Sequence, residues 1–198
     1  LSDRNLDTAE GILQGFVKYA GVPILNMESA TGHPLQALAD ALTIAETAKK
    51  TTPKVVLSWA PHPRALPQAV PNSFIRIMQR MPVDLVITHP KGYELDANLA
   101  GAYQPVYDQN KALEGADFVY VKNWSSVQEY GQVLNRDPGW MMTTEKLGDA
   151  RFMHCLPVRR NMVVADGVLD GPHSLVLNQA ANRTLSAQLA LKHILDVL

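Results

Sequence analysis

Short apolar runs rich in β-branched residues alternate with segments of helical periodicity along most of the chain. This alternation predicts an α/β fold, a doubly wound parallel sheet with helices on both faces, because parallel strands need crossover connections. The predicted strands are residues 23–27, 54–59, 84–88, 117–121, 151–155 and 174–177. The predicted helices are residues 33–48, 72–81, with Asn72 or Ser73 as cap, and 182–198.

Composition narrows the classes of function. Hydrophobic residues make up 46% of the 198 residues and charged residues 19%, which supports a packed core. A net charge of -1 gives no reason to expect nucleic acid or an anionic membrane as partner, and no apolar segment reaches the ~20 residues of a bilayer span. The single cysteine, Cys155, excludes an internal disulfide and indicates a reducing cytoplasm. No glycine-rich nucleotide motif occurs, so no cofactor is expected.

Unusual polar residues follow the predicted strands. Ligands of open parallel sheets bind beyond the carboxyl ends of the strands, so these residues are candidates for a common site. They are Glu28, His33, His62, Arg64, His89, Lys122, Cys155, Arg159 and Arg160.

A His-Pro-Leu-Gln motif begins the helix predicted at residue 33. The free N–H groups and partial positive charge of a helix start favour anionic groups. There the imidazole of His33 is suited to donate to a developing oxyanion, with Gln36 one turn on to hold an amide. The alternative is purely structural, with Pro34 at the first helical position and His33 as cap.

Two further segments offer cations beside predicted strands. Prolines crowd residues 61–71 and make a stiff loop, suited either to presenting His62 or Arg64 to a ligand or to serving as a rigid connector. Lys122 follows a buried strand, where it either meets a carboxylate or is merely solvated.

The last third of the chain adds adjacent functional-looking residues. His154 and Cys155 suggest a metal or a nucleophile, but no second cysteine at ligand spacing and no acid to orient the histidine support either. Arg159 and Arg160 favour an anionic ligand. Arg183 is predicted at the start of the last helix, where a cation opposes the helix dipole and calls for an anion, unless it is a simple surface arginine.

Taken in order, these motifs resemble the transcarbamylase family. The resemblance rests on His-Pro-x-Gln at 33–36, His-Cys-Leu-Pro at 154–157 and the arginine at 183. Ornithine transcarbamylases carry Asp-x-Trp-x-Ser-Met-Gly where residues 122–127 read Lys-Asn-Trp-Ser-Ser-Val. Losing the acid and gaining a cation suits an N-acylated ornithine, because acylation removes the α-ammonium and a succinyl group adds a carboxylate. The chain is therefore similar to the N-succinylornithine and N-acetylornithine branch.

Within that branch, the residues of the proline-rich loop and of the segment around Arg159 and Arg160 resemble the succinylornithine form more closely. The acetylornithine form carries a lysine that can be carboxylated shortly after the paired arginines, and Val163 stands there. The carbamoyl-phosphate motif Ser-x-Arg-Thr does not occur in the chain. The resemblance thus implies an N-acylornithine-binding second domain at residues 1–177, and a helix at 178–198 that returns to a carbamoyl-phosphate domain. Such a piece is expected to be inactive alone.

The resemblance also implies a reaction and a site. The δ-amine of N-succinylornithine or N-acetylornithine would attack carbamoyl phosphate in arginine biosynthesis, with no cofactor or metal. His33 would polarise the carbamoyl oxygen, Gln36 and the backbone of Cys155 and Leu156 would hold its amide, and Arg183 would neutralise charge.

Substrate binding, assembly and rival functions complete these expectations. The substrate-binding residues implied are Glu28, His62, Lys122 and Arg159. The family resemblance further implies a cytoplasmic homotrimer with a knotted chain. The alternatives are ordinary ornithine or putrescine carbamoylation, and a non-catalytic module that binds an acylated amino acid. An upstream Ser-x-Arg-Thr in the parent reading frame would favour the enzyme.

Overall fold

A five-stranded parallel sheet forms the centre of the molecule. The computed structural model describes residues 3–197. The strands are β1 (Lys54–Trp59), β2 (Asp84–Thr88), β3 (Pro105–Val106), β4 (Phe118–Lys122) and β5 (Arg151–Met153). Their order is β3-β2-β1-β4-β5, with every neighbouring pair parallel. The order reverses between β1 and β4, which in open α/β sheets is the usual place for a ligand site.

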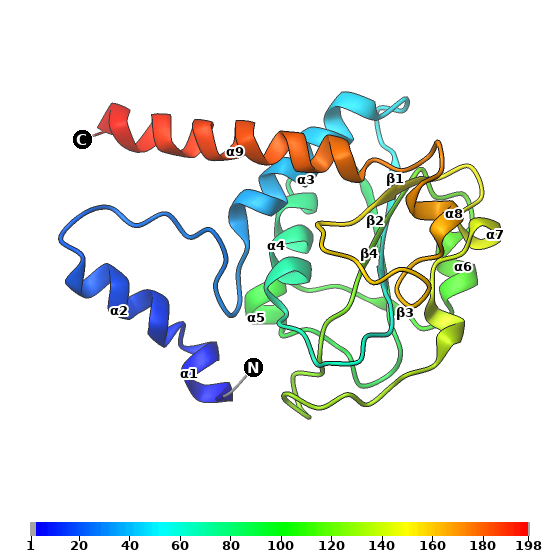
Figure 1. Ribbon diagram of the computed structural model, residues 1–198, viewed down its shortest axis with the longest axis horizontal. Coiled ribbons are helices and arrows are strands. Elements are labelled where there is room, and N and C mark those ends of the chain that lie inside the picture. Colours follow the sequence, from blue (N-terminus) through cyan, green and yellow to red (C-terminus); the bar gives the residue numbers. More distant parts are fainter. Residues whose placement is uncertain (1–2, 198) are drawn as a thin grey trace.

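Helices cover both faces of the sheet (Figure 1). One face carries α3 (Pro34–Thr47), α4 (Ala69–Met78) and α9 (Val176–Val197), with α9 lying across α3. The other face carries α6 (Gln109–Leu113), α7 (Thr144–Leu147) and α8 (Asp166–Leu169). The remaining helices are α1 (Arg4–Thr8), α2 (Gly11–Tyr19), α5 (Ala97–Ala100) and a short 3-10 turn at Pro138–Trp140.

The alternation of side chains along β1 explains the two layers of core. Val55, Leu57 and Trp59 face the core shared with α3 and α4, whereas Val56 faces the core shared with α6 to α8. A strand that is buried on both faces has a continuous run of apolar residues, and this run is why β1 could be predicted from the sequence. None of the helices within residues 3–197 has the length and apolar character needed to cross a bilayer.

The predicted α/β class with a parallel sheet is confirmed, and the strands at 54–59 and 84–88 have their predicted bounds. β4 is shifted by one residue, β5 ends two residues early, and the two-residue β3 was not predicted. Two predicted strands are wrong. Residues 23–27 pair with no strand among the described residues, and Ser174 makes only an isolated bridge to Phe152 before α9 begins.

The helix predicted at 33–48 is α3, at Pro34–Thr47, but two other helices begin earlier than predicted. α4 begins at Ala69 rather than at residue 72, so neither Asn72 nor Ser73 caps it. α9 begins at Val176, six residues before the predicted start. Arg183 therefore lies two turns inside α9, and the expectation that it opposes the dipole at a helix start is wrong. The division between residues 177 and 178 falls inside this helix and stays a prediction.

Candidate functional site

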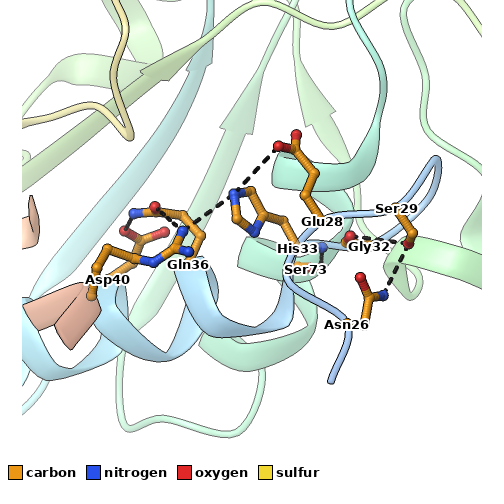
Figure 2. Close-up of polar contacts among 9 residues, drawn as sticks. Asn26, Glu28, Ser29, Gly32, His33, Gln36, Asp40 and Ser73 are labelled. Atoms are coloured by element: carbon orange, nitrogen blue, oxygen red, sulfur yellow. Dashed lines mark hydrogen bonds and ion pairs between the residues drawn. The ribbon is translucent and has the colours of Figure 1, made fainter. Parts of the chain in front are cut away.

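The start of α3 and the second turn of α9 bring three candidate residues together. Nη1 of Arg183 donates to Oε1 of Gln36 at 2.8 Å and lies 3.3 Å from Nε2 of His33. Oε2 of Glu28 approaches the same nitrogen from another direction, at 3.7 Å (Figure 2). The two helices thus join residues 150 positions apart in sequence.

Two groups act in opposite directions on the protonation of His33. A guanidinium can only donate, so the contact with Arg183 favours a neutral imidazole with its proton on Nδ1, whereas the Glu28 carboxylate at 3.7 Å favours a proton on Nε2. Burial lowers the pKa of His33, the Glu28 carboxylate raises it, and the charges of Arg183 and Lys122 lower it further. With its proton on Nδ1, the imidazole must gain a proton or change tautomer before Nε2 can donate to a carbamoyl oxygen.

A carboxylate from the start of α2 holds the loop that leads into His33. Glu10 accepts hydrogen bonds from Oγ of Ser29 at 2.6 Å, from the backbone N–H of Thr31 at 2.9 Å and from that of Ala30 at 3.2 Å. The backbone N–H of His33 donates to Oγ of Ser73 at 2.8 Å. The backbone that carries the imidazole is thus held from α2 and α4.

Beneath Gln36 lies a buried carboxyl that sequence reasoning missed. Asp40 Oδ1 accepts from Nε2 of Gln36 at 2.7 Å and from Nε2 of Gln179 at 2.8 Å. Burial raises the pKa of Asp40 to about 7, against the hydrogen bonds of the two amides. The available signal was the four-residue spacing of Gln36 and Asp40, which places both on one face of α3.

The loop after β5 forms the second group of candidate residues. His154 is buried, its backbone N–H donates to Oε1 of Gln179 at 2.8 Å, and its Nδ1 accepts from the N–H of Leu156 at 2.9 Å. Leu156 has φ 54°, in the left-handed region that side chains disfavour. Burial lowers the pKa of His154 to about 3, helped by the charges of Lys122 and His62.

The thiol in this loop is not activated. Burial raises the pKa of Cys155, and the nearby ammonium of Lys122 only partly offsets that effect. A protonated thiol is a poor nucleophile. Among residues 3–197, no three His, Cys, Asp or Glu side chains gather as metal ligands would.

The predicted substrate-binding cations lie around the end of β4. Nε of Arg159 donates to Nε2 of His62 at 3.1 Å, so His62 is neutral and its Nδ1 faces the carbonyl of Arg64 at 2.9 Å. Burial lowers the pKa of His62, the Arg64 carbonyl raises it, and the charges of Arg159 and Lys122 lower it. Because Lys122 acts on His33, His62 and His154 alike, both groups of candidate residues surround it.

Some candidate residues stand apart from this site. Arg160 pairs with Asp166 and Asp170 at 2.8 and 2.6 Å, so only one of the two adjacent arginines is left for an anionic ligand. His89 is completely buried, with Nε2 3.3 Å from the hydroxyl of Tyr103, and serves the core.

Known proteins resemble the chain in sequence. The family model for the Asp/Orn binding domain of aspartate/ornithine carbamoyltransferase matches residues 67–194. The N-succinylornithine carbamoyltransferase of Bacteroides thetaiotaomicron is 51% identical, over 98% of this chain and 63% of that protein. The N-acetylornithine carbamoyltransferase of Xylella fastidiosa is 33% identical, over 91% of this chain and 61% of that protein.

Solved structures agree with the sequence relatives. A crystal structure of N-acetyl-L-ornithine transcarbamylase matches with a TM-score of 0.81 and 32% identity, over 94% of this chain and 63% of that one. An acetylornithine transcarbamylase complexed with acetylcitrulline matches with a TM-score of 0.83 and 33% identity, over 94% of this chain and 62% of that one. The chain thus spans less than two thirds of the length of these relatives.

Proposed function

The chain belongs to the aspartate/ornithine carbamoyltransferase family, and we propose that it supplies the amino-acid-binding part of an enzyme that carbamoylates an N-acylated ornithine. The observation that carries the proposal is the convergence of His33, Gln36 and Arg183 at one point beside Lys122. These are the residues for which the sequence motifs implied a role toward the carbamoyl group.

The chemistry requires positioning and charge stabilisation. The δ-amine nitrogen forms a bond to the carbamoyl carbon, the bond from that carbon to the phosphate oxygen breaks, and the proton lost by the amine goes to the departing phosphate or to solvent. Arg183 would neutralise the charge developing on the carbamoyl oxygen or phosphate, with His33 beside it. Gln36 would accept from the carbamoyl amide, together with the backbone at Cys155 and Leu156. Donors fixed in advance are the main source of rate in such acyl transfers.

The charges around β4 favour an N-acylated substrate over free ornithine. Lys122, Arg159 and His62 would offer cationic or neutral groups to carboxylates, and Glu28 would be the acid nearest the reacting amine. A free α-ammonium would be repelled by Lys122, and a putrescine dication even more so. We infer a succinyl rather than an acetyl group, because the succinylornithine relative is 51% identical and the acetylornithine relative 33%.

Assembly and biological setting follow the same resemblance. We propose a homotrimer with a chain knotted near the proline-rich loop, acting in arginine synthesis in the cytoplasm. Sedimentation of the full-length protein tests the trimer.

The test of function uses the full-length protein and carbamoyl phosphate. Formation of ureido product is measured with N-succinylornithine, N-acetylornithine and ornithine in parallel. We expect turnover with N-succinylornithine, little with N-acetylornithine and none with ornithine. Turnover with ornithine alone would contradict the argument from Lys122. Binding of an acylated ornithine without turnover would make the protein a non-catalytic binding module.

A further inference from the structure

Asp40 lies between the two groups of candidate residues and is hydrogen-bonded to Gln36 on α3 and to Gln179 on α9. Its carboxyl is completely buried within α3, and the mechanism above gives it no role. Burying a carboxyl is costly unless its hydrogen bonds compensate, so its presence here calls for a reason. One oxygen, Oδ1, receives both of its hydrogen bonds, from Gln36 and from Gln179.

These two hydrogen bonds decide which way each amide points. A side-chain amide has one donating and one accepting end, and a half-turn exchanges them. Because Asp40 takes the NH2 end of Gln36, the Oε1 end must face Arg183, which donates to it at 2.8 Å. Because Asp40 also takes the NH2 end of Gln179, its Oε1 must face the backbone N–H of His154 at 2.8 Å. One carboxyl oxygen therefore orients both amides.

The consequence reaches both groups of candidate residues. The first amide fixes the guanidinium of Arg183 beside the imidazole of His33. The second fixes the backbone at the end of β5, directly before Cys155 and Leu156. A disordered amide at either position would let donor and acceptor exchange at the place where the carbamoyl group is expected.

We propose that Asp40 is a positioning residue for carbamoyl transfer, whose carboxyl holds Gln36 and Gln179 in the one amide orientation that serves the site. The proposal rests on the proposed function. Oδ1 can accept both hydrogen bonds whether the carboxyl is ionised or protonated on Oδ2. That second oxygen lies near the hydroxyl of Tyr120, which lowers the pKa of Asp40, although neither atom makes a hydrogen bond of normal geometry within residues 3–197. The role thus requires the acceptor and not the charge.

Two replacements of similar size separate these requirements. In the full-length enzyme, D40N keeps an oxygen for both amides and places its NH2 toward Tyr120. D40L keeps the volume and removes the acceptor. We expect D40N to retain kcat within about threefold, and D40L to lower kcat by about ten- to a hundredfold with KM for N-acylornithine nearly unchanged. A crystal structure of D40N should keep Oε1 of Gln36 on Arg183.

The control is T43V, one turn further along α3. Thr43 is buried in the same helix interface, where its hydroxyl donates to the carbonyl of Ala39 and accepts from Asn182, and no hydrogen bond joins it to Gln36 or Gln179. T43V should lower the melting temperature and leave kcat unchanged, which separates loss of packing from loss of orientation.

Three outcomes would overturn the proposal. If kcat of D40N falls as far as that of D40L, the charge of Asp40 matters and not only its acceptor. If D40L is as active as the wild type, Asp40 has no positioning role. If T43V loses as much kcat as D40L, the effect is one of packing. If D40L does not fold, Q179M replaces it, because this variant removes only the hydrogen bond between Asp40 and Gln179 and leaves that to Gln36. A fall in kcat of about fivefold or more then supports the proposal, and unchanged kcat contradicts it. Turnover of the wild-type enzyme is measured first. If the wild type has no activity, the proposed function fails, and this outcome is distinct from failure of the role proposed for Asp40.

Discussion

At the scale of single residues, Lys122 has the widest electrostatic influence in the candidate site. It ends β4 and its charge lowers the pKa of His33, His62 and His154. A neutral histidine can accept a hydrogen bond from a guanidinium, and the arginine contacts of His33 and His62 favour that form. The lysine thus favours the neutral form of the imidazoles around it, beyond any contact it makes with a substrate.

We predict that K122M raises the pKa of His62. The neighbouring ammonium disfavours a second positive charge, so removing it makes protonation easier and moves the pKa up toward its ordinary value. NMR titration of the imidazole carbon-bound protons measures the shift. K111M is the control, because Lys111 is an exposed residue of α6 and has no part in this shift. An unchanged or lower pKa in K122M would contradict the proposed electrostatics.

The residues that sequence reasoning found and missed differ in kind. His33, Gln36 and Arg183 stand in recognisable motifs, and the structure brings them together. Asp40 and Gln179 act through other residues and carry no motif. Their partnership spans 139 positions and depends on how α9 crosses α3, which a single sequence does not contain.

At the scale of elements, the interface of α3 and α9 reverses the usual amphipathic pattern. The inward face of α9 carries buried polar residues, whereas its leucines at 185 and 189 are half exposed. The buried residues are Gln179, Asn182 and Ser186. Periodicity analysis looks for an apolar inner face, so it placed the start of α9 at residue 182 and missed the first six residues. β1 and β2 were predicted correctly because their burial follows the usual rule.

We predict that N182A destabilises the protein and N178A does not. Nδ2 of Asn182 donates to Oγ1 of Thr43 at 3.0 Å and to Oε2 of Glu46 at 2.9 Å, whereas Asn178 is exposed one turn earlier. N182A should lower the free energy of unfolding by about 1–2 kcal/mol, and N178A should change it by less than ~0.5 kcal/mol. Urea denaturation of both variants measures the difference. Equal effects would mean that the polar interface does not hold the two helices.

At the scale of the whole molecule, the candidate site lies on one half of the sheet. Its residues follow β1, β4 and β5, beside the reversal of strand order, and come from α3 and α9. Exposed apolar side chains lie elsewhere, on α2 at Ile12 and Phe16 and on α9 at Leu185 and Leu189. Because the relatives are longer than this chain, the effect of these side chains on stability is best measured with and without the rest of the protein.

We predict that replacing Leu185 and Leu189 together by serine lowers the free energy of unfolding of the 198-residue chain by about 1–2 kcal/mol. They are 50% and 55% exposed, so only about half of each side chain's apolar area is buried in this chain. F74A serves as the contrast, since Phe74 is completely buried and its loss should cost about 3–5 kcal/mol. Thermal or urea unfolding of the chain measures both. A loss in the chain as large as that of F74A would place the two leucines in its core, whereas a clearly larger loss in the full-length protein than in the chain would show that they are covered there.

The packing of α9 across α3 also affects the order in which the growing chain can fold during translation. Gln36 and Asp40 are translated well before Gln179 and Arg183, which belong to α9, so the polar face of α3 has no partner while the residues between them are translated. Asp40 and Gln179 are 139 positions apart, so at ~5–20 residues per second that interval lasts about seven to thirty seconds. During it, water rather than Gln179 solvates Asp40, and Gln36 is free to rotate. The candidate site is therefore among the last features of this fold to form on the ribosome.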